Sequence, residues 1–190
     1  HSTTKFINGH GTVIGGALVS RDSDFIENGG GALVRYMGAV PSALDCWLTG
    51  IGLKTLPLRM REHCSNARVL AEYLDTHPKV VETYWPGLAG HPQHEVASRQ
   101  MDDFGAMLSI ELGGYDSACR FMDGLEMASL AVSLGNVDTL VQHPASMTHR
   151  LWPPEDRLAV GITDGLVRIS VGLEDPADIL VDFERALSGV

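Results

Sequence analysis

Apolar residues recur at helical spacing in two long segments of the later part of the chain. From Leu56 to Leu74 they fall three or four positions apart with charged residues between them, which predicts an amphipathic helix that ends before Pro78. Asp175 as N-cap and Pro176 at the first helical position predict a final helix. Its apolar face consists of Ile179, Leu180, Phe183 and Leu187.

Strand patterns lie between these two helices. Residues 79–84 are rich in β-branched side chains, and residues 106–112 and 167–171 alternate apolar with polar positions, as half-buried strands do. Residues 91–101 and 116–125 have the pattern of shorter helices. The alternation of strands and helices predicts a compact α/β layer.

The first 50 residues have a different pattern. Residues 12–14 and 15–20 are short apolar runs with glycines, which favours buried strands at the end of a larger sheet. Gly29 to Gly31 predict a loop or bend, and Pro41 with Ser42 opens a helix. We therefore expect residues 1–56 to be the C-terminal part of one domain. Residues 57–190 are expected to form a complete smaller domain.

Composition narrows the classes of partner. The 190 residues carry 24 acidic and 14 basic side chains, a net charge of -10, which argues against nucleic acid and anionic membranes as partners. No apolar stretch approaches the roughly 20 residues that span a bilayer. The three cysteines are an odd number and favour a reducing compartment over a disulfide framework, so we expect a cytoplasmic protein.

A single lysine lies among small hydroxyl residues close to the start of the sequence. Lys5 could form a Schiff base with an aldehyde cofactor, while Ser2 and Thr4 could donate hydrogen bonds to its phosphate. This pattern indicates pyridoxal 5'-phosphate chemistry. A solvated loop lysine is the alternative, and the motif alone does not decide between them.

The candidate site residues later in the chain also have alternative interpretations without a functional role. Arg168 interrupts an apolar strand, where it either faces solvent or grips a substrate carboxylate bidentately. Ser133 follows the apolar residues 130–132 and either forms a turn or lines a pocket. Residues 143–149 combine histidines with hydroxyl groups, and an ordinary loop with buried polar groups is the alternative.

Two other site types are disfavoured. His91 and His94 could share a metal, but no cysteine or carboxylate cluster completes the ligand set, so a surface turn and helix start is the better interpretation and no metal is expected. The glycines of residues 9–16 do not have the spacing of a dinucleotide-binding loop.

Read together, these segments resemble the Cys/Met-metabolism family of fold-type I pyridoxal-phosphate enzymes. That family includes cystathionine γ-synthase, cystathionine γ-lyase, methionine γ-lyase and acylhomoserine sulfhydrylases. The resemblance runs through the whole chain, and the blocks that carry it are residues 1–10, 38–42, 52–56, 59–60, 84–88, 91–92, 133–135, 143–149 and 166–175.

The resemblance implies an α/β fold of type I: the end of the large cofactor domain followed by the smaller C-terminal α/β domain. It implies that Lys5 is the Schiff-base lysine, that Ser2 and Thr4 bind the cofactor phosphate, and that Arg168 holds the substrate carboxylate with Ser133 nearby. It also implies that the chain is the C-terminal half of such an enzyme, whose earlier half supplies further cofactor contacts. The family pattern is a homotetramer, a dimer of dimers with shared active sites.

The expected reaction is γ-elimination on a sulfur amino acid. The resemblance places a glutamate before Ser133 in cystathionine-specific enzymes, whereas this chain has Val132, as in methionine γ-lyases and sulfhydrylases. Residues 34–37 lack the methionine γ-lyase pattern, and residues 38–42 with Asp45 and Cys46 are more similar to cystathionine γ-lyase. Methionine γ-lyase activity is favoured, with cystathionine γ-lyase, cystathionine γ-synthase and O-acetylhomoserine sulfhydrylase as alternatives. A different type I enzyme such as an aminotransferase, or a non-catalytic α/β interaction module, stays open.

Overall fold

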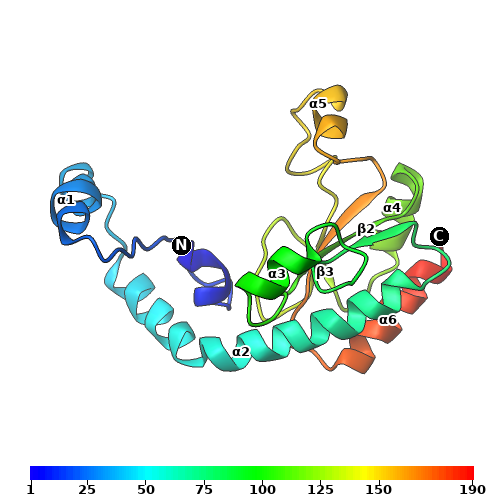
Figure 1. Ribbon diagram of the computed structural model, residues 1–190, viewed down its shortest axis with the longest axis horizontal. Coiled ribbons are helices and arrows are strands. Elements are labelled where there is room, and N and C mark those ends of the chain that lie inside the picture. The colour runs from blue at the N-terminus through cyan, green and yellow to red at the C-terminus, as the bar shows by residue number, and fades with distance from the viewer. The chain divides into compact units, whose positions relative to one another are not determined.

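The computed structural model describes residues 1–190, which form two compact units, residues 1–57 and residues 58–190 (Figure 1). The helix α2, Ala43–Asp75, contains the boundary between them. The two helices predicted from the sequence around this boundary are one continuous helix with Pro57 inside it. Proline removes a single backbone donor, and the remaining 32 residues continue the helix. That residues 1–56 end a larger cofactor domain stays a prediction.

Unit 1 contains the two π-helical segments η1 (Thr3–Ile7) and η2 (Phe25–Gly30), the helix α1 (Gly31–Met37) and the first turns of α2. The strands predicted for residues 12–20 are wrong. The only pairing is an isolated antiparallel bridge between Ser2 and Gly16, and Ile14 is 90% exposed. An apolar run becomes a buried strand only beside a partner strand, and unit 1 offers none.

The prediction of a bend at Gly29 to Gly31 is also wrong, because Gly30 ends η2 and Gly31 begins α1. A Cβ atom at Gly31 would lie 1.9 Å from the carbonyl oxygen of Ile26. Glycine is therefore required here by close backbone packing within a helix. The sequence alone does not distinguish such a glycine from one that allows a bend.

The start of α2 confirms the prediction made from Ser42. The Ser42 hydroxyl accepts a hydrogen bond from the Asp45 amide at 3.1 Å and donates one to the Asp45 carboxylate at 2.8 Å. This satisfies a backbone donor that the first helical turn leaves without an intrahelical partner. No helix of the structure, α2 included, combines the length and apolar character that crossing a membrane requires.

Unit 2 is built on a five-stranded sheet with the order β1-β2-β5-β4-β3. Neighbouring strands are antiparallel except β3 and β4, which are parallel. The three strands predicted from sequence are present. The strand bounds are Glu82–Tyr84 for β1, Met107–Glu111 for β2, Ser129–Leu130 for β3, Leu140–Gln142 for β4 and Leu166–Ser170 for β5.

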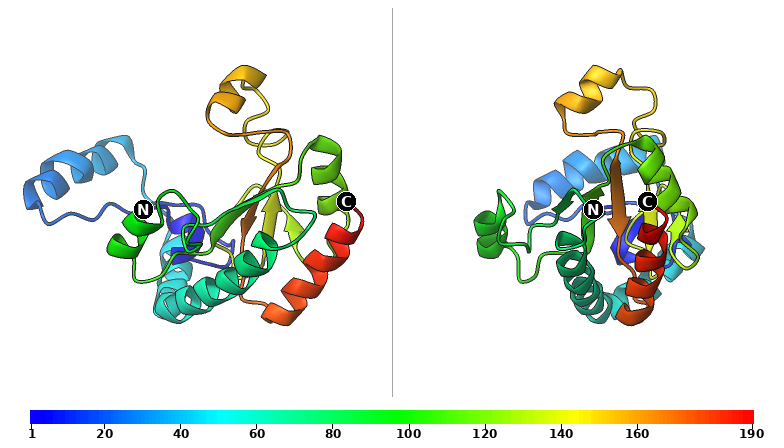
Figure 2. Two further views of the ribbon diagram at one scale, coloured as in Figure 1. Left: turned by 45° about the vertical axis from the view of Figure 1, so that its right-hand side comes forward. Right: turned by 90° about the vertical axis from the view of Figure 1, so that its right-hand side faces the viewer.

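One face of this sheet is apolar and forms the core. Leu108, Ile110, Val167 and Ile169 are at most 2% exposed and pair across β2 and β5, so they share that face. The part of α2 that belongs to unit 2 and the helix α6 lie side by side along it, whereas α5 projects away from them (Figures 1 and 2). The remaining helices are α3 (His94–Gln100), α4 (Tyr115–Asp123), α5 (Pro154–Ala159) and α6 (Pro176–Ser188).

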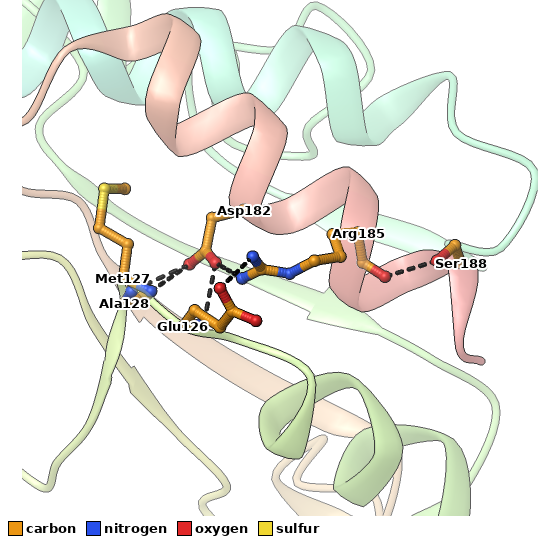
Figure 3. A network of polar contacts seen from close by, with 6 residues as sticks. All are labelled: Glu126, Met127, Ala128, Asp182, Arg185 and Ser188. Carbon is orange, nitrogen blue, oxygen red and sulfur yellow. Dashed lines mark hydrogen bonds and ion pairs between the residues drawn. The ribbon is translucent and has the colours of Figure 1, made fainter.

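The buried carboxylate of Asp182 joins α6 to the turn that leads into β3 (Figure 3). It accepts hydrogen bonds from the amides of Glu126 at 2.8 Å, Met127 at 3.2 Å and Ala128 at 2.9 Å, and it pairs with Arg185. Three backbone donors and a guanidinium compensate the desolvation of this charge. The contacts fix where β3 begins and, through it, the start of the loop that follows.

Candidate active site

Lys5 lies inside η1, at a kink in its backbone. Its φ of -95° and ψ of -137° are not helical, although its neighbours continue the helical path on both sides. The amide of Gly9 donates to the Lys5 carbonyl at 2.8 Å, and the amide of Asn8 donates to Thr3 at 3.1 Å. The lysine is partly buried, and its backbone is held by these bonds.

The Thr4 hydroxyl faces the glycine-rich segment beside η1. It accepts from the Gly15 amide at 2.9 Å and donates to the Gly15 carbonyl at 3.3 Å. A strong O–H···O bond measures about 2.7–2.8 Å, so this hydrogen is held weakly and can turn to another acceptor. Ser2 is exposed. Two hydroxyls and an amine within four residues fit the donor set that a phosphate-bearing aldehyde requires, although they do not make a complete cofactor site by themselves.

The side chain of Asn8 organises the turn that follows Lys5. Its Oδ1 accepts from the His10 amide at 3.2 Å and from the Thr12 amide and hydroxyl at 3.3 and 3.1 Å. Its backbone packs directly on α2, because a Cβ atom at Gly52 would lie 2.2 Å from the Asn8 carbonyl oxygen. No role was predicted for Asn8 from the sequence. The Asn8-Gly9 pair is the sequence signal that could have indicated this turn, because Gly9 adopts the left-handed conformation with a φ of 72°.

A cavity of about 590 Å³ lies in unit 1, between the glycine-rich segment and the start of α2. Its lining is mainly apolar and includes Val13, Ile14, Val40 and Leu53. Lys5 is not among the lining residues, and neither are Ser2 and Thr4. The cavity is therefore distinct from the hydroxyl and amine groups described above.

In unit 2 the structure brings Arg168 together with Val132 and Ser133. Nη2 of Arg168 donates to the carbonyl oxygen of Val132 at 3.1 Å and to that of Ser133 at 2.8 Å. Burial lowers the pKa of the Arg168 guanidinium, which is charged at neutral pH all the same. The solvent-facing alternative does not describe this partly buried side chain. Both Nη2 hydrogens have protein acceptors, so the Nη1 hydrogens and the Nε hydrogen remain available for other partners.

The loop of residues 132–139, which carries Ser133, is also tied to the end of β5. The amide of Gly135 donates to the Ser170 hydroxyl at 2.8 Å, and the Thr139 amide donates to the Glu174 carboxylate at 2.5 Å. The Thr139 hydroxyl accepts from the Gly172 amide at 2.9 Å. With the two Arg168 bonds, these contacts hold the loop along its whole length. The supporting roles of Gly135, Thr139, Ser170 and Glu174 were not predicted from the sequence.

Helix α2 supports the same segment from the core side. His63 Nδ1 lies 2.7 Å from the Val171 carbonyl oxygen, which can only accept, so Nδ1 carries the hydrogen. Asn66 donates to the carbonyls of Gly172 at 3.2 Å and Glu174 at 2.8 Å. His63 and Asn66 are buried. Burial lowers the pKa of His63, so the ring is neutral at physiological pH.

The block of residues 143–149 is a polar turn whose first three residues are buried. The Ser146 amide donates to His143 Nδ1 at 3.2 Å, so this nitrogen is an acceptor and the hydrogen is on Nε2. Nε2 then donates to the Asp164 carbonyl at 2.9 Å. The tautomer of His143 is thus fixed by two backbone contacts, and the ring packs edge-on against Tyr115.

His91 and His94 take part in the turn that leads into α3. His94 Nδ1 donates to the Pro86 carbonyl at 2.8 Å, and its ring stacks on Phe104. His91 Nδ1 accepts from the Gln93 amide at 3.2 Å. No group of three His, Cys, Asp or Glu side chains in the structure could hold a metal ion.

Comparison with known proteins shows similarity along the whole chain. The family model of the Cys/Met metabolism PLP-dependent enzymes matches residues 1–188. An L-methionine γ-lyase of Fusobacterium nucleatum subsp. polymorphum is 49% identical over all of this chain and 48% of its own length. A cystathionine β-lyase of Coxiella burnetii is 43% identical over 98% of the chain and 49% of its own length.

Solved structures agree with this. A cystathionine γ-synthase of Xanthomonas oryzae pv. oryzae has a TM-score of 0.94 and 48% identity, covering 99% of this chain and 49% of that one. An enzyme of Micromonospora echinospora, described both as a cystathionine γ-lyase and as a methionine γ-lyase, has a TM-score of 0.94 in one structure at 47% identity, covering 100% of this chain and 50% of that one.

The chain spans about half the length of the curated relatives it matches. The type I fold expected from the resemblance is confirmed by the solved structures, and the family model extends over both units. This chain belongs to the Cys/Met metabolism PLP-dependent enzyme family.

Proposed function

We propose that this protein catalyses γ-elimination on a sulfur-containing amino acid, as a methionine γ-lyase that releases a thiol, ammonia and a 2-oxo acid. The observation that carries the proposal is the fixed guanidinium of Arg168 beside Val132 and Ser133. It supplies a carboxylate anchor next to an uncharged side chain. Methionine γ-lyases from four genera are 45–49% identical to this chain, which supports the same reaction.

Lys5, Ser2 and Thr4 are the residues proposed to hold the cofactor. Lys5 would bind the aldehyde through its Nζ, and the hydroxyls of Ser2 and Thr4 would donate to the phosphate. Bound pyridoxal phosphate supplies an electron sink for the charge that develops when a substrate Cα proton leaves. Once it is released from the cofactor, the Lys5 amine would accept that proton, which requires Nζ to be uncharged at this step. The same amine then delivers a proton later in the elimination.

Arg168 is proposed to bind the substrate carboxylate. Its two Nη1 hydrogens are uncommitted, whereas its Nη2 hydrogens are donated to the loop of residues 132–139. The loop thereby orients the guanidinium before a ligand arrives, which reduces the entropy lost on binding. Val132, 53% exposed, would lie beside the substrate tail and favour a thioether over a charged group.

A second candidate is cystathionine γ-synthase or γ-lyase chemistry, and O-acetylhomoserine sulfhydrylase chemistry is related to it. The structural match to the Xanthomonas oryzae cystathionine γ-synthase favours it, because that enzyme was solved with cystathionine bound. Synthase and lyase reactions share the removal of the Cα proton, so the roles proposed for Lys5 and Arg168 hold in both. They differ in what contacts the distal end of the substrate.

The assembly and location proposed for the full-length protein follow the family pattern. We propose a homotetramer built as a dimer of dimers with active sites shared across subunits, in the cytoplasm. The net charge of -10 supports a small amino-acid substrate over a nucleic-acid partner. The free thiols of Cys46, Cys64 and Cys119 support a reducing compartment.

The test uses the full-length protein. Purified protein should show the visible absorption band of a lysine-bound cofactor, and borohydride should fix the cofactor on Lys5 in a peptide map. Methionine, homocysteine, cystathionine and O-acetylhomoserine are then assayed for thiol, ammonia and 2-oxo acid. Lys5→Ala should abolish the band and turnover, whereas Lys54→Ala, an exposed lysine of α2, should change neither. Absence of the band rejects cofactor binding, and transamination without elimination rejects the proposed reaction.

A further inference from the structure

Gln142 lies directly opposite Arg168 in the sheet of unit 2. The two residues are partners in the antiparallel register of β4 and β5. Side chains paired in this way project from the same face of the sheet, with Cβ atoms about 4.5–5.5 Å apart. Gln142 is 1% exposed, so a neutral amide is buried beside the charge proposed to bind substrate.

Both residues carry a buried polar atom without a hydrogen-bond partner in the protein. For Arg168 this atom is Nε, a donor, and for Gln142 it is Oε1, an acceptor. The large majority of buried side-chain polar atoms have a partner. A donor and an acceptor that lack partners on paired residues therefore complement each other. No direct hydrogen bond joins the two atoms, which leaves one bridging water as the natural connection.

The other end of the Gln142 amide is fixed. Its Nε2 donates to the Thr148 hydroxyl at 2.5 Å, and that hydroxyl lies 3.0 Å from His149 Nδ1. The His149 ring packs edge-on against Trp152. The block of residues 143–149, to which the proposed reaction assigns no step, thus holds the orientation of Gln142 and leaves Oε1 available.

We propose that Gln142 is a positioning residue for Arg168, whose Nε–H it holds through one bridging water. The two carbonyls of Val132 and Ser133 hold Nη2, and Gln142 holds Nε, so the guanidinium plane is fixed from two sides and Nη1 is presented to the ligand. This inference rests on the proposed carboxylate-binding role of Arg168. Gln142 would hold Arg168 without contacting any substrate atom.

The test measures binding of a carboxylate separately from turnover. L-Norleucine has no γ-leaving group, and n-pentylamine is the same molecule without its carboxylate. Calorimetric titration of the full-length holoenzyme with each compound isolates the carboxylate contribution. Gln142→Met keeps the length of the side chain and removes the amide. We expect norleucine to bind about tenfold more weakly to this variant, with pentylamine changed less than about twofold, as for loss of one charge-assisted hydrogen bond.

Three further variants make the result specific. Thr148→Val frees the Gln142 amide and should weaken norleucine binding by about threefold in the same direction. Thr83→Val removes a buried hydroxyl that also lacks a partner, but on the opposite face of the sheet, and should leave both affinities unchanged. In an Arg168→Met background, Gln142→Met should cause no additional loss, because the group that it positions is absent.

Steady-state kinetics provide a second readout. Gln142→Met should raise KM for methionine about tenfold with kcat within about threefold, because a carboxylate anchor contributes equally to ground state and transition state. Unchanged norleucine binding in Gln142→Met and Thr148→Val would overturn the inference, as would an equal loss for norleucine and pentylamine. If Arg168→Met itself leaves norleucine binding unchanged, the carboxylate role of Arg168 is wrong and the role of Gln142 is rejected with it. The two failures are therefore distinguishable.

Discussion

Nη2 of Arg168 donates a hydrogen bond to the carbonyl oxygen of Ser133 at 2.8 Å, across 35 residues of sequence. One side chain thus joins the centre of the sheet to the loop that follows β3. The charge proposed to bind substrate and the loop proposed to line its site are therefore held in one arrangement. Mutations on either side should affect both ligand binding and the stability of the loop.

Replacement of Arg168 by lysine should separate charge from geometry. Arg168→Lys keeps a positive charge, but one ammonium group cannot satisfy two carbonyls and a carboxylate in the planar arrangement of a guanidinium. We expect norleucine affinity to fall by about 10- to 100-fold and the free energy of unfolding by about 1–3 kcal/mol, from calorimetry and urea denaturation. Arg150→Lys, at an exposed position, should alter neither. Affinity equal to that of the parent would contradict the proposed contact.

The side chain before Ser133 should select the substrate. Val132→Glu places a carboxylate at a position that is 53% exposed, so the fold should tolerate it. We expect the ratio of kcat/KM for cystathionine to that for methionine to rise by about tenfold, because the glutamate can pair with the distal ammonium of cystathionine. Val160→Glu, at a position 60% exposed, is the matched control. If the ratio does not move, Val132 does not contact the substrate tail.

Close packing at Gly52 should control the segment that carries Lys5. Gly52→Ala would place a methyl group 2.2 Å from the Asn8 carbonyl oxygen, so one of the two backbones must shift. We expect a lower melting temperature and weaker retention of the cofactor during dialysis. Gly50→Ala, also in α2, meets nothing within 4 Å and should stabilise the helix by up to about 1 kcal/mol. Equal effects of the two substitutions would contradict the close approach at Gly52.

The buried carboxylate of Asp182 should contribute more to stability than an exposed one on the same helix. Asp182→Asn turns an amide group toward three backbone donors and removes the charge that pairs with Arg185, so we expect a loss of about 2–4 kcal/mol in the free energy of unfolding. Asp178→Asn, in the exposed first turn of α6, should cost at most about 1 kcal/mol. Urea denaturation of both variants measures the difference.

Stability should fall in mild acid partly because of His63. Burial is the largest cause that lowers the pKa of this ring in the folded protein, so the unfolded chain binds a proton more readily. Below the ordinary histidine pKa of about 6.5, proton uptake then favours unfolding, and stability declines as pH falls toward the lowered value. His63→Gln should show a smaller decline between pH 7.5 and 5.5 in denaturant titrations. An identical decline in both proteins would assign it to other groups.

The elements that sequence analysis predicted correctly are those with a clear period. The final helix has the cap expected from Asp175, whose carboxylate accepts from the Ala177 amide at 2.8 Å. The buried positions of β2 alternate as predicted, and those of β5 do so up to Ile169, after which Ser170 is buried as well. Such elements are recognisable because each buries one face against a core that the chain itself provides.

The elements that sequence analysis missed depend on what surrounds them. Residues 12–20 are largely apolar but pair at one position only, and the glycines at 29–31 lie in a helical stretch where Gly31 approaches the Ile26 carbonyl closely. Local sequence does not distinguish a glycine required by crowding from one that allows a bend. Helix α2 likewise runs through Pro57, because flanking helical residues outweigh one missing hydrogen bond.

The sequence by itself determined the family, through ordered motifs around Lys5, Ser133 and Arg168, because a cofactor and a carboxylate restrict which residue types can bind them. Only the tertiary structure decided how Arg168 is held. Gln142 and Ser133 are 26 and 35 residues away from it, and no sequence period relates them. The strand order β5-β4 and its register place Gln142 opposite Arg168, and the loop after β3 returns Ser133 to the guanidinium. Backbone hydrogen bonding across the sheet sets these contacts.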